Sequence, residues 1–226
     1  PSSTDIVAAV ASEQTRARIV LFLLAAGMVM ALVGIWSSIR QHQLLALMGS
    51  GVQAAPGEAD ANDARQAGIA VIQVAVLLAT VVMWCLWQYR AYANLKLVGT
   101  RDTEYTPGWS VGYWFIPIMN LFRPYQITAE LHRRSELVNQ RDPLGGLSRP
   151  TIVGVWWLFW IVAGFFSRMS ASMSRGSTTV DDFIRATDYQ IVDDVLGIVT
   201  ATLAFIIVRN IDRFQRPFTS AIGAHV

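Results

Sequence analysis

The sequence has little charge. Of its 226 residues, 15% are Asp, Glu, Lys or Arg, whereas 53% are apolar. Soluble domains carry about 25% charged residues, so much of this chain's surface must face something other than water. The apolar residues are gathered in long blocks, which is the arrangement expected of helices that cross a lipid bilayer. An ordinary soluble domain is therefore excluded.

Residue types that ligate metals or act as nucleophiles are also scarce. Cys85 is the only cysteine, which excludes an internal disulfide. His42, His132 and His225 are the only histidines and fall outside the apolar blocks, where they cannot hold a haem between spans. There is no phosphate-binding loop and no nucleophile-elbow pattern. We therefore expect no catalytic residue, metal, cofactor or nucleic-acid partner, and a protein that is not an enzyme.

Four apolar blocks are long enough to span a membrane, because about 20 helical residues cross a ~30 Å hydrocarbon core. They lie at about 19–39, 67–89, 151–169 and 191–208. The first block exceeds the core of a signal peptide, so we interpret it as an uncleaved anchor. The sequence thus predicts an all-α integral membrane protein with a single membrane domain over residues 1–226.

The outer side of this arrangement is expected to hold polar loops over 40–66 and 168–190. Asp193 and Asp194 fall in the first turn of the fourth block, where carboxylates suit the positive end of a helix. We expect them to be interfacial charges in water. Pairing of one of them with Arg168 is the alternative.

A fifth uncharged stretch, Tyr105–Phe122, reads YTPGWSVGYWFIPIMNLF. Pro107 and Pro117 disfavour a straight helix in lipid. Four spans with a cytoplasmic N-terminus leave 13 of 18 basic residues inside, whereas five spans leave only 8. Basic residues favour the cytoplasmic side. We therefore expect both termini to be cytoplasmic, and a segment over 105–122 that is re-entrant from that side or lies along the interface.

An amphipathic helix is expected directly after this segment, over Pro124–Val138. Proline suits the first turn of a helix, and Ile127 and Leu131 follow at helical spacing. Such a helix lies on the cytoplasmic membrane surface. Glu130 and Arg134 stand four residues apart, and we expect them to form a solvated surface pair.

The run from Trp87 to Ser135 resembles a known family. Its elements YRAYAN, PGW, FIP, NL, RPYQ and EL fall on Tyr89–Asn94, Pro107–Trp109, Phe115–Pro117, Asn120–Leu121, Arg123–Gln126 and Glu130–Leu131. In order and spacing they resemble the bacterial membrane family called domain of unknown function 4328. The resemblance covers about a quarter of the chain strongly. It implies a multi-span bacterial membrane protein and leaves its activity open.

Within this run, a set of residues could form a platform for lipid or a partner protein. Basic residues at headgroup level attract anionic lipid by ~1 kcal/mol each, although ordinary positive-inside charge explains them equally well. A break at Pro117 would free backbone carbonyls, which ion and substrate sites use, or would serve only as a structural wedge. The candidate set is Arg90, Tyr92, Asn94, Trp109, Trp114, Pro117, Asn120, Arg123, Pro124, Tyr125 and Gln126.

Small residues recur at helical spacing on two of the expected spans. Such stripes allow helices to approach closely in lipid. We expect them to pack the first span against the last, or against a second subunit. They are Gly27, Ala31 and Gly34 on the first span and Gly197, Ala201 and Ala204 on the last.

Two functional hypotheses follow. The first is a non-enzymatic scaffold, assembly or regulatory protein of the bacterial inner membrane, whose cytoplasmic-leaflet platform binds anionic lipid or a membrane-protein partner. The second is a small oligomeric channel or transporter that uses residues 105–122 as a pore or substrate element. Self-association into a homo-oligomer is compatible with both.

Overall fold

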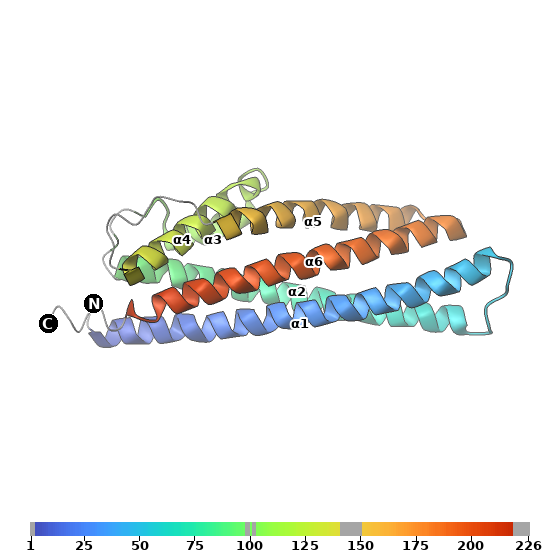
Figure 1. Ribbon diagram of the computed structural model, residues 1–226, viewed down its shortest axis with the longest axis horizontal. Helices are drawn as coiled ribbons and strands as arrows, with labels where there is room; N and C mark the ends of the chain where they lie inside the picture. The colour runs from blue at the N-terminus through green and yellow to red at the C-terminus, as the bar shows by residue number, and fades with distance from the viewer. Residues whose placement is uncertain (1–2, 98–99, 101–102, 141–150, 219–226) are drawn as a thin grey trace. The chain divides into compact units, whose positions relative to one another are not determined.

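The computed structural model describes residues 3–97, 100, 103–140 and 151–218, and every element within these ranges is a helix. In chain order they are α1 (Ser3–Gly49), α2 (Glu58–Leu97), α3 (Pro107–Gly112), the 3-10 helices η1 (Tyr113–Phe115) and η2 (Met119–Leu121), α4 (Arg123–Gln140), α5 (Thr151–Gly176) and α6 (Val180–Gln215) (Figure 1). The helices α1, α2, α5 and α6 are each long and apolar enough to cross a membrane. The predicted all-α class and the four candidate spans are confirmed.

The long helices extend well past the expected spans. The loop between α1 and α2 covers only residues 50–57, and that between α5 and α6 only 177–179. The prediction of polar loops over 40–66 and 168–190 is therefore wrong in extent. Residues 40–48 are rich in Leu, Gln and Ala, which favour a helix. Gly51 and Gly57, with φ of 85° and 81°, supply the left-handed backbone of the turn that follows.

The start of α6 is set by a reciprocal pair of hydrogen bonds. The Asp182 backbone N–H donates to Thr179 Oγ1 at 3.2 Å, and the Thr179 N–H donates to Asp182 Oδ2 at 3.1 Å. This arrangement satisfies donors that the first turn of a helix leaves open. As a result, α6 begins eleven residues before the expected span at residue 191.

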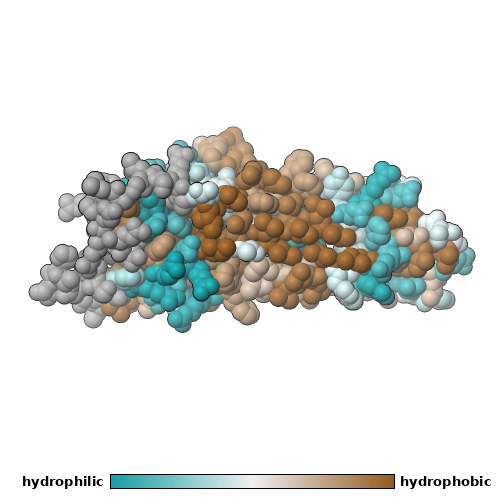
Figure 2. Space-filling view, in the orientation of Figure 1, coloured by the Kyte–Doolittle hydropathy of each residue, from teal (hydrophilic) through white to brown (hydrophobic). Residues whose placement is uncertain are grey.

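The surface of the long helices matches a lipid environment along their middle. In the face shown in Figure 2, hydrophobic residues are gathered over the middle of the helices, and hydrophilic residues are gathered toward their ends. Large apolar side chains such as Phe22, Val71 and Leu158 are 60% or more exposed. Exposure of this kind is unfavourable in water and suits contact with acyl chains.

The chain divides into two compact units, and each long helix contributes a part to both. Unit 1 comprises residues 1–24, 79–157 and 203–226. Unit 2 comprises residues 25–78 and 158–202. Each unit is described separately below.

The core of unit 1 contains a cluster of tryptophans. Trp84 of α2 lies edge-on to Trp87, with ring centroids 5.1 Å apart, and stacks on Trp156 of α5 at 5.5 Å. Trp114 of η1 packs against the same rings, 6.2 Å from Trp84 and 6.1 Å from Trp157. Aromatic contacts of this geometry add to the gain from burial. They hold the segment after α3 against α2 and α5.

Proline chemistry shapes the segment from 105 to 122. Thr106 caps α3 by accepting a hydrogen bond from the Trp109 N–H, and Pro107 occupies the first turn. Ile116 precedes Pro117 and is extended, with φ −99° and ψ 111°, as the residue before a proline prefers. The expected break at Pro117 is present, and it separates η1 from η2.

The helix expected over 124–138 is present as α4, but its surroundings differ from the expectation. Ile127 and Leu131 are fully buried. His132 packs edge-on against Phe214 of α6, with ring centroids 5.4 Å apart. In Figure 1, α4 runs obliquely alongside the ends of α2 and α6. Its apolar face therefore packs on protein, whereas the sequence predicted a helix lying on the membrane surface.

The two stripes of small residues do not behave alike. Gly34 is buried in unit 2, and a Cβ added there would lie 2.7 Å from Asp194 Oδ2. Ala31 is 9% exposed, whereas Gly27 has room for a Cβ, with its nearest neighbour 3.9 Å away. Gly197 faces open space. The first stripe thus makes one close contact, with a polar side chain, and the last stripe makes none at Gly197.

Two members of the last stripe remain. Ala201 is half-buried in unit 2, and Ala204 is 4% exposed in unit 1. Ala204 therefore packs inside its own unit. Gly197 is exposed within its unit. Packing of the two stripes against each other or against a second subunit stays a prediction.

Candidate functional site

The centre of the family-like run is a buried carboxylate. Glu130 of α4 is 4% exposed and accepts a hydrogen bond from the Tyr92 hydroxyl at 2.5 Å. Its other oxygen accepts from the Glu104 backbone N–H at 2.9 Å. The Tyr92 oxygen in turn accepts from the Tyr105 N–H at 3.1 Å. The expected pair with Arg134 is formed at 3.7 Å, but it is not a solvated pair, because its carboxylate is inside the protein.

A second buried network joins α2, α4 and α6. The Gln215 side chain is fully buried and donates to the Ala91 carbonyl at 2.9 Å and to Ser135 Oγ at 3.0 Å. Asn94 completes it by donating to Gln215 Oε1 at 3.1 Å. Amide side chains suit this role because each both donates and accepts. The network fixes the register of three helices around Asn94.

Arg123 closes the segment that began at Tyr105. Its Nη1 donates to the Tyr105 hydroxyl and to Gln126 Oε1, both at 3.0 Å. Its guanidinium also lies over the rings of Tyr105 and Tyr113, at 5.8 and 5.7 Å from their centroids. The two ends of the segment therefore meet. Residues 105–122 thus form a closed lobe.

A polar pocket of about 210 Å³ lies beside this closure. Tyr125 and Ala129 form part of its wall, and Arg123 and Arg133 both reach it. The buried Nε of Arg123 has no hydrogen-bond partner within the described residues. Two guanidinium groups at one pocket suit a ligand that carries phosphate or carboxylate oxygens. The remaining lining residues are Glu104, Tyr105, Gln126 and Glu130.

The outer side of the closed lobe is apolar. Phe115 and Ile118 are each 69% exposed, Leu121 is 57% exposed and Trp109 is 51% exposed. The fold presents these side chains outward while both ends of the lobe are tied to buried groups. Apolar exposure of this extent marks a surface that meets a membrane or a partner.

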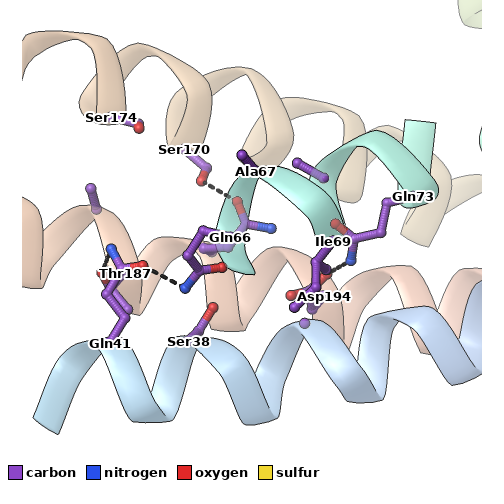
Figure 3. Close-up of a pocket in the computed structure, with 14 residues that line it drawn as sticks. Ser38, Gln41, Gln66, Ala67, Ile69, Gln73, Ser170, Ser174, Thr187 and Asp194 are labelled. Atoms are coloured by element: carbon purple, nitrogen blue, oxygen red, sulfur yellow. Dashed lines mark hydrogen bonds between the residues drawn. The ribbon is translucent and has the colours of Figure 1, made fainter. Parts of the chain in front are cut away.

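A different pocket lies in unit 2, between parts of α1, α2, α5 and α6 (Figure 3). It has a volume of about 330 Å³. Its walls carry four glutamines, three serines, a threonine and a single carboxylate, that of Asp194. The lining residues are Gly34, Ser38, Gln41, Gln66, Ala67, Ile69, Ala70, Gln73, Ser170, Ser174, Ala186, Thr187, Gln190 and Asp194.

Hydrogen bonds between the lining residues hold this second pocket open. Gln66 donates to Gln41, and Gln41 donates to Thr187 Oγ1 at 3.2 Å. Ser170 donates to Gln190 at 3.3 Å across α5 and α6 (Figure 3).

The expectation that Asp194 sits in water is wrong: it is 8% exposed and lies within the helix segments of unit 2.

The comparisons with known proteins return one family. The model of the domain of unknown function DUF4328 matches residues 50–213. The chain belongs to the DUF4328 family. No curated protein and no solved structure matches it significantly. The match confirms the resemblance read from the sequence and extends it over α2, α5 and most of α6.

The candidate platform residues separate into buried, exposed and half-buried groups. Tyr92, Asn94 and Pro124 are buried, so they cannot contact lipid or a partner directly. Trp109, Pro117 and Gln126 are exposed on or beside the closed lobe. The remainder are half-buried, namely Arg90, Trp114, Asn120, Arg123 and Tyr125.

Hydrogen bonds and a place in the pocket lining account for most of the half-buried residues. Arg90 donates to the Ala9 carbonyl at 3.2 Å, and Trp114 donates to Gln88 Oε1 at 3.0 Å. Arg123, Tyr125 and Gln126 come together at the pocket of unit 1. Arg90 and Trp114 instead hold helices together.

Sequence reasoning missed two residues that dominate these sites. Glu130 lies inside the family-like run, but a Glu and an Arg four residues apart look the same in sequence whether the pair is buried or solvated. Asp194 was placed in the first turn of a span, because the start of α6 was expected too late. The Thr-x-x-Asp pattern at Thr179–Asp182 is the signal that would have moved this start.

Loss of the Tyr92 hydroxyl should destabilise the protein. In Tyr92→Phe, Glu130 loses a donor and the Tyr105 N–H loses an acceptor while both stay buried. Unsatisfied buried groups cost about 1–3 kcal/mol each, so thermal unfolding in detergent should occur at a clearly lower temperature. Tyr89→Phe is the matched control, because Tyr89 is 46% exposed. Equal melting temperatures for the two variants would contradict the central role of Glu130.

His132 should make stability depend on pH. It is 6% exposed, neither ring nitrogen has a hydrogen-bond partner within the described residues, and burial lowers its pKa below the ordinary 6.5, with Glu136 opposing this. The unfolded chain therefore binds a proton near pH 6.5 that the folded chain does not. Stability is complete above that pH and falls below it, by up to about 1.4 kcal/mol per pH unit.

The test compares melting temperatures at pH 8 and pH 5.5. His132→Leu should lose less stability between the two pH values than the natural chain. His42→Gln serves as the control, because His42 pairs with Asp188 at 3.0 Å and should leave the effect of His132 in place. An unchanged pH dependence in His132→Leu would show that other groups cause it.

Proposed function

We propose that this chain is a non-enzymatic, multi-pass protein of the bacterial inner membrane that uses the closed lobe and the pocket beside it to bind anionic lipid in the cytoplasmic leaflet. The observation that carries the proposal is the pairing of an apolar lobe with arginines at its base. Such a surface would serve as the platform of a scaffold, assembly or regulatory protein.

The lobe has the properties of a segment inserted into the shallow part of a leaflet. Phe115, Ile118 and Leu121 project from a fold whose ends are tied together by Arg123 and Tyr105. Irregular backbone at membrane depth needs protein partners. The contact of Trp114 with the tryptophan cluster supplies one such partner. Trp109 is stacked on Tyr113 at 4.9 Å, and aromatic residues of this kind favour the headgroup region.

The pocket of unit 1 lies where a lipid headgroup would be when the lobe is inserted. Arg123 makes its hydrogen bonds with neutral oxygens, from Tyr105 and Gln126, so its charge is not cancelled by a carboxylate in those contacts. Arg133 is half-buried and lines the same pocket. Arg123 and Arg133 can pair with a headgroup phosphate, beside the carboxylates of Glu104 and Glu130 that line the same pocket.

The orientation of the chain follows from its basic residues. With the loops 50–57 and 177–179 outside, 13 of the 18 Lys and Arg residues lie on the side of the N-terminus, the lobe and α4. The positive-inside bias then places that side in the cytoplasm. This supports cytoplasmic termini and a lobe in the inner leaflet.

A channel or transporter built on residues 105–122 is less well supported. The exposed side chains of the lobe are apolar, whereas a pore lining needs polar groups or charge. An enzyme is also less well supported, because His42 and His132 lie in different units and His132 packs against Phe214.

The proposed topology predicts which sites an impermeant thiol reagent can reach. In a Cys85→Ser background, Ser50→Cys and Ser177→Cys should be labelled in intact cells, because both fall in the outer loops. Ser148→Cys should be labelled only after the cells are opened. Labelling of Ser148→Cys in intact cells, with protection of the other two, would show the inverted topology.

The lipid proposal predicts selective stabilisation by anionic lipid. The natural chain in detergent should melt at a higher temperature with added phosphatidylglycerol than with added phosphatidylcholine. Arg133→Gln should lose most of this difference, because one of two cations at the pocket is removed. Arg18→Gln is the control, since Arg18 is exposed and does not line the pocket.

Two outcomes would contradict this proposal. Equal stabilisation by both lipids would show that the protein does not prefer an anionic headgroup. A phosphatidylglycerol effect that survives in Arg133→Gln but disappears in Arg18→Gln would place the lipid elsewhere. If lipid has no effect, binding of a partner protein to the lobe becomes the better reading of its apolar surface.

A further inference from the structure

The pocket of unit 2 plays no part in the lipid proposal, and its chemistry points to a ligand of the opposite charge. Asp194 is the only ionisable residue among those that line it. The carboxylate is 8% exposed, and its Oδ2 atom has no hydrogen-bond partner within the described residues. Oδ1 accepts from Gln73 Nε2 at 3.3 Å. A buried carboxylate with one unmatched oxygen calls for a cationic partner.

The nearby cations of unit 2 are engaged elsewhere. Arg65 donates to Ser37 Oγ at 2.9 Å and to Asn62 Oδ1 at 2.5 Å, and it lies over the Trp36 ring. His42 pairs with Asp188 at 3.0 Å. Arg168 donates to the Gly164 carbonyl at 2.8 Å. None of these three residues lines the pocket.

The walls supply the remaining partners of a cation that carries N–H groups. Gln66 and Gln73 use their amide nitrogens as donors in the network, so each keeps a side-chain carbonyl oxygen that can accept from a ligand. An ammonium group donates three hydrogen bonds. The Asp194 carboxylate and these two glutamine side chains all line one cavity (Figure 3).

The size of the cavity favours an organic cation over a metal ion. The cavity of about 330 Å³ is in the range that holds small molecules. Within the described residues, no group of three or more His, Cys, Asp or Glu side chains could hold a metal ion. The serine and threonine hydroxyls on the walls suit a polar substituent next to the cationic group.

The lack of a side chain at Gly34 of α1 makes room for the Asp194 carboxylate. A Cβ at this position would lie 2.7 Å from Asp194 Oδ2 and 2.8 Å from Gln73 Nε2. Any other residue would push these two groups aside. The absence of a side chain at Gly34 thus leaves room for Oδ2 against α1.

We propose that the pocket of unit 2 binds a small molecule with a protonated primary amine, whose ammonium group pairs with Asp194 and donates to Gln66 and Gln73. The ammonium could belong to a free amine or to the headgroup of phosphatidylethanolamine, which presents the same chemistry. This inference does not depend on lipid binding at the lobe.

The test measures the melting temperature of the full chain in detergent with ethanolamine as the probe. Ethanolamine should raise it, whereas ethylene glycol, which lacks the charge, and tetramethylammonium, which lacks N–H donors, should not. Asp194→Asn should weaken ethanolamine binding about tenfold or more, as expected for loss of a charge-assisted hydrogen bond. Asp193→Asn is the matched control, because Asp193 is the neighbouring carboxylate and does not line the pocket.

A second pair of variants tests the same site by shape. Gly34→Ala should also abolish the response to ethanolamine, because its methyl group displaces Oδ2. Gly27→Ala should keep it, since the nearest atom to an added Cβ there is 3.9 Å away. In the absence of amine, Asp194→Asn should be at least as stable as the natural chain, because it removes an unmatched charge. A purely structural carboxylate would instead make Asp194→Asn less stable.

The source of the amine is distinguished in nanodiscs. Stabilisation by phosphatidylethanolamine over phosphatidylcholine, lost in Asp194→Asn, identifies the lipid headgroup. A response to free ethanolamine without that lipid effect identifies a free amine. The proposal is overturned if Asp194→Asn responds like the natural chain, if sodium or tetramethylammonium chloride stabilises equally, or if neither source has an effect.

Discussion

The burial of Glu130 is the constraint on which the arrangement of unit 1 depends. A carboxylate inside a protein is costly unless it is paired and hydrogen-bonded. Its donors come from Tyr92 on α2 and from the Glu104 backbone before α3, and Arg134 on α4 itself forms an ion pair with it at 3.7 Å. Because these partners belong to separate segments, satisfying one carboxylate fixes the position of three segments together. The closed lobe starts from this fixed point, so its apolar tip can be exposed without loss of its shape.

Both units bury polar side chains, and both keep buried polar atoms that have no hydrogen-bond partner within the described residues. In unit 1, the side chains of Gln88 and Gln215 find partners on several segments. In unit 2, the glutamines surround a cavity, and Asp194 keeps an unmatched oxygen. Satisfied networks specify a fold, whereas a carboxylate at a polar cavity between membrane helices marks a functional site. We infer that the buried residues of the candidate platform are architectural and that a ligand acts at unit 2.

Helix number and the break in the lobe could be read from the sequence because both depend on local chemistry. The length of the apolar blocks indicated four spans, and Pro117 indicated the break between η1 and η2. That the segment does not cross the bilayer stays a prediction. Burial of Glu130 could not be read, because its partner Tyr92 lies 38 residues away and the local Glu–Arg spacing is the same in water. Asp194 was misplaced for another reason. The cap at Thr179 starts α6 at Val180, so Asp194 lies well inside the helix rather than in its first turn.

The division of the unit 2 pocket between helices has a consequence for its selectivity. The family match over residues 50–213 includes Gln73 and Asp194, which carry the proposed ammonium contacts, but it stops short of α1. From α1 come Gly34, Ser38 and Gln41, and the first of these sets the space beside the carboxylate. The charge of the site and its size therefore reside on different helices. A substitution on α1 can change the size of amine that fits without altering the carboxylate that attracts it.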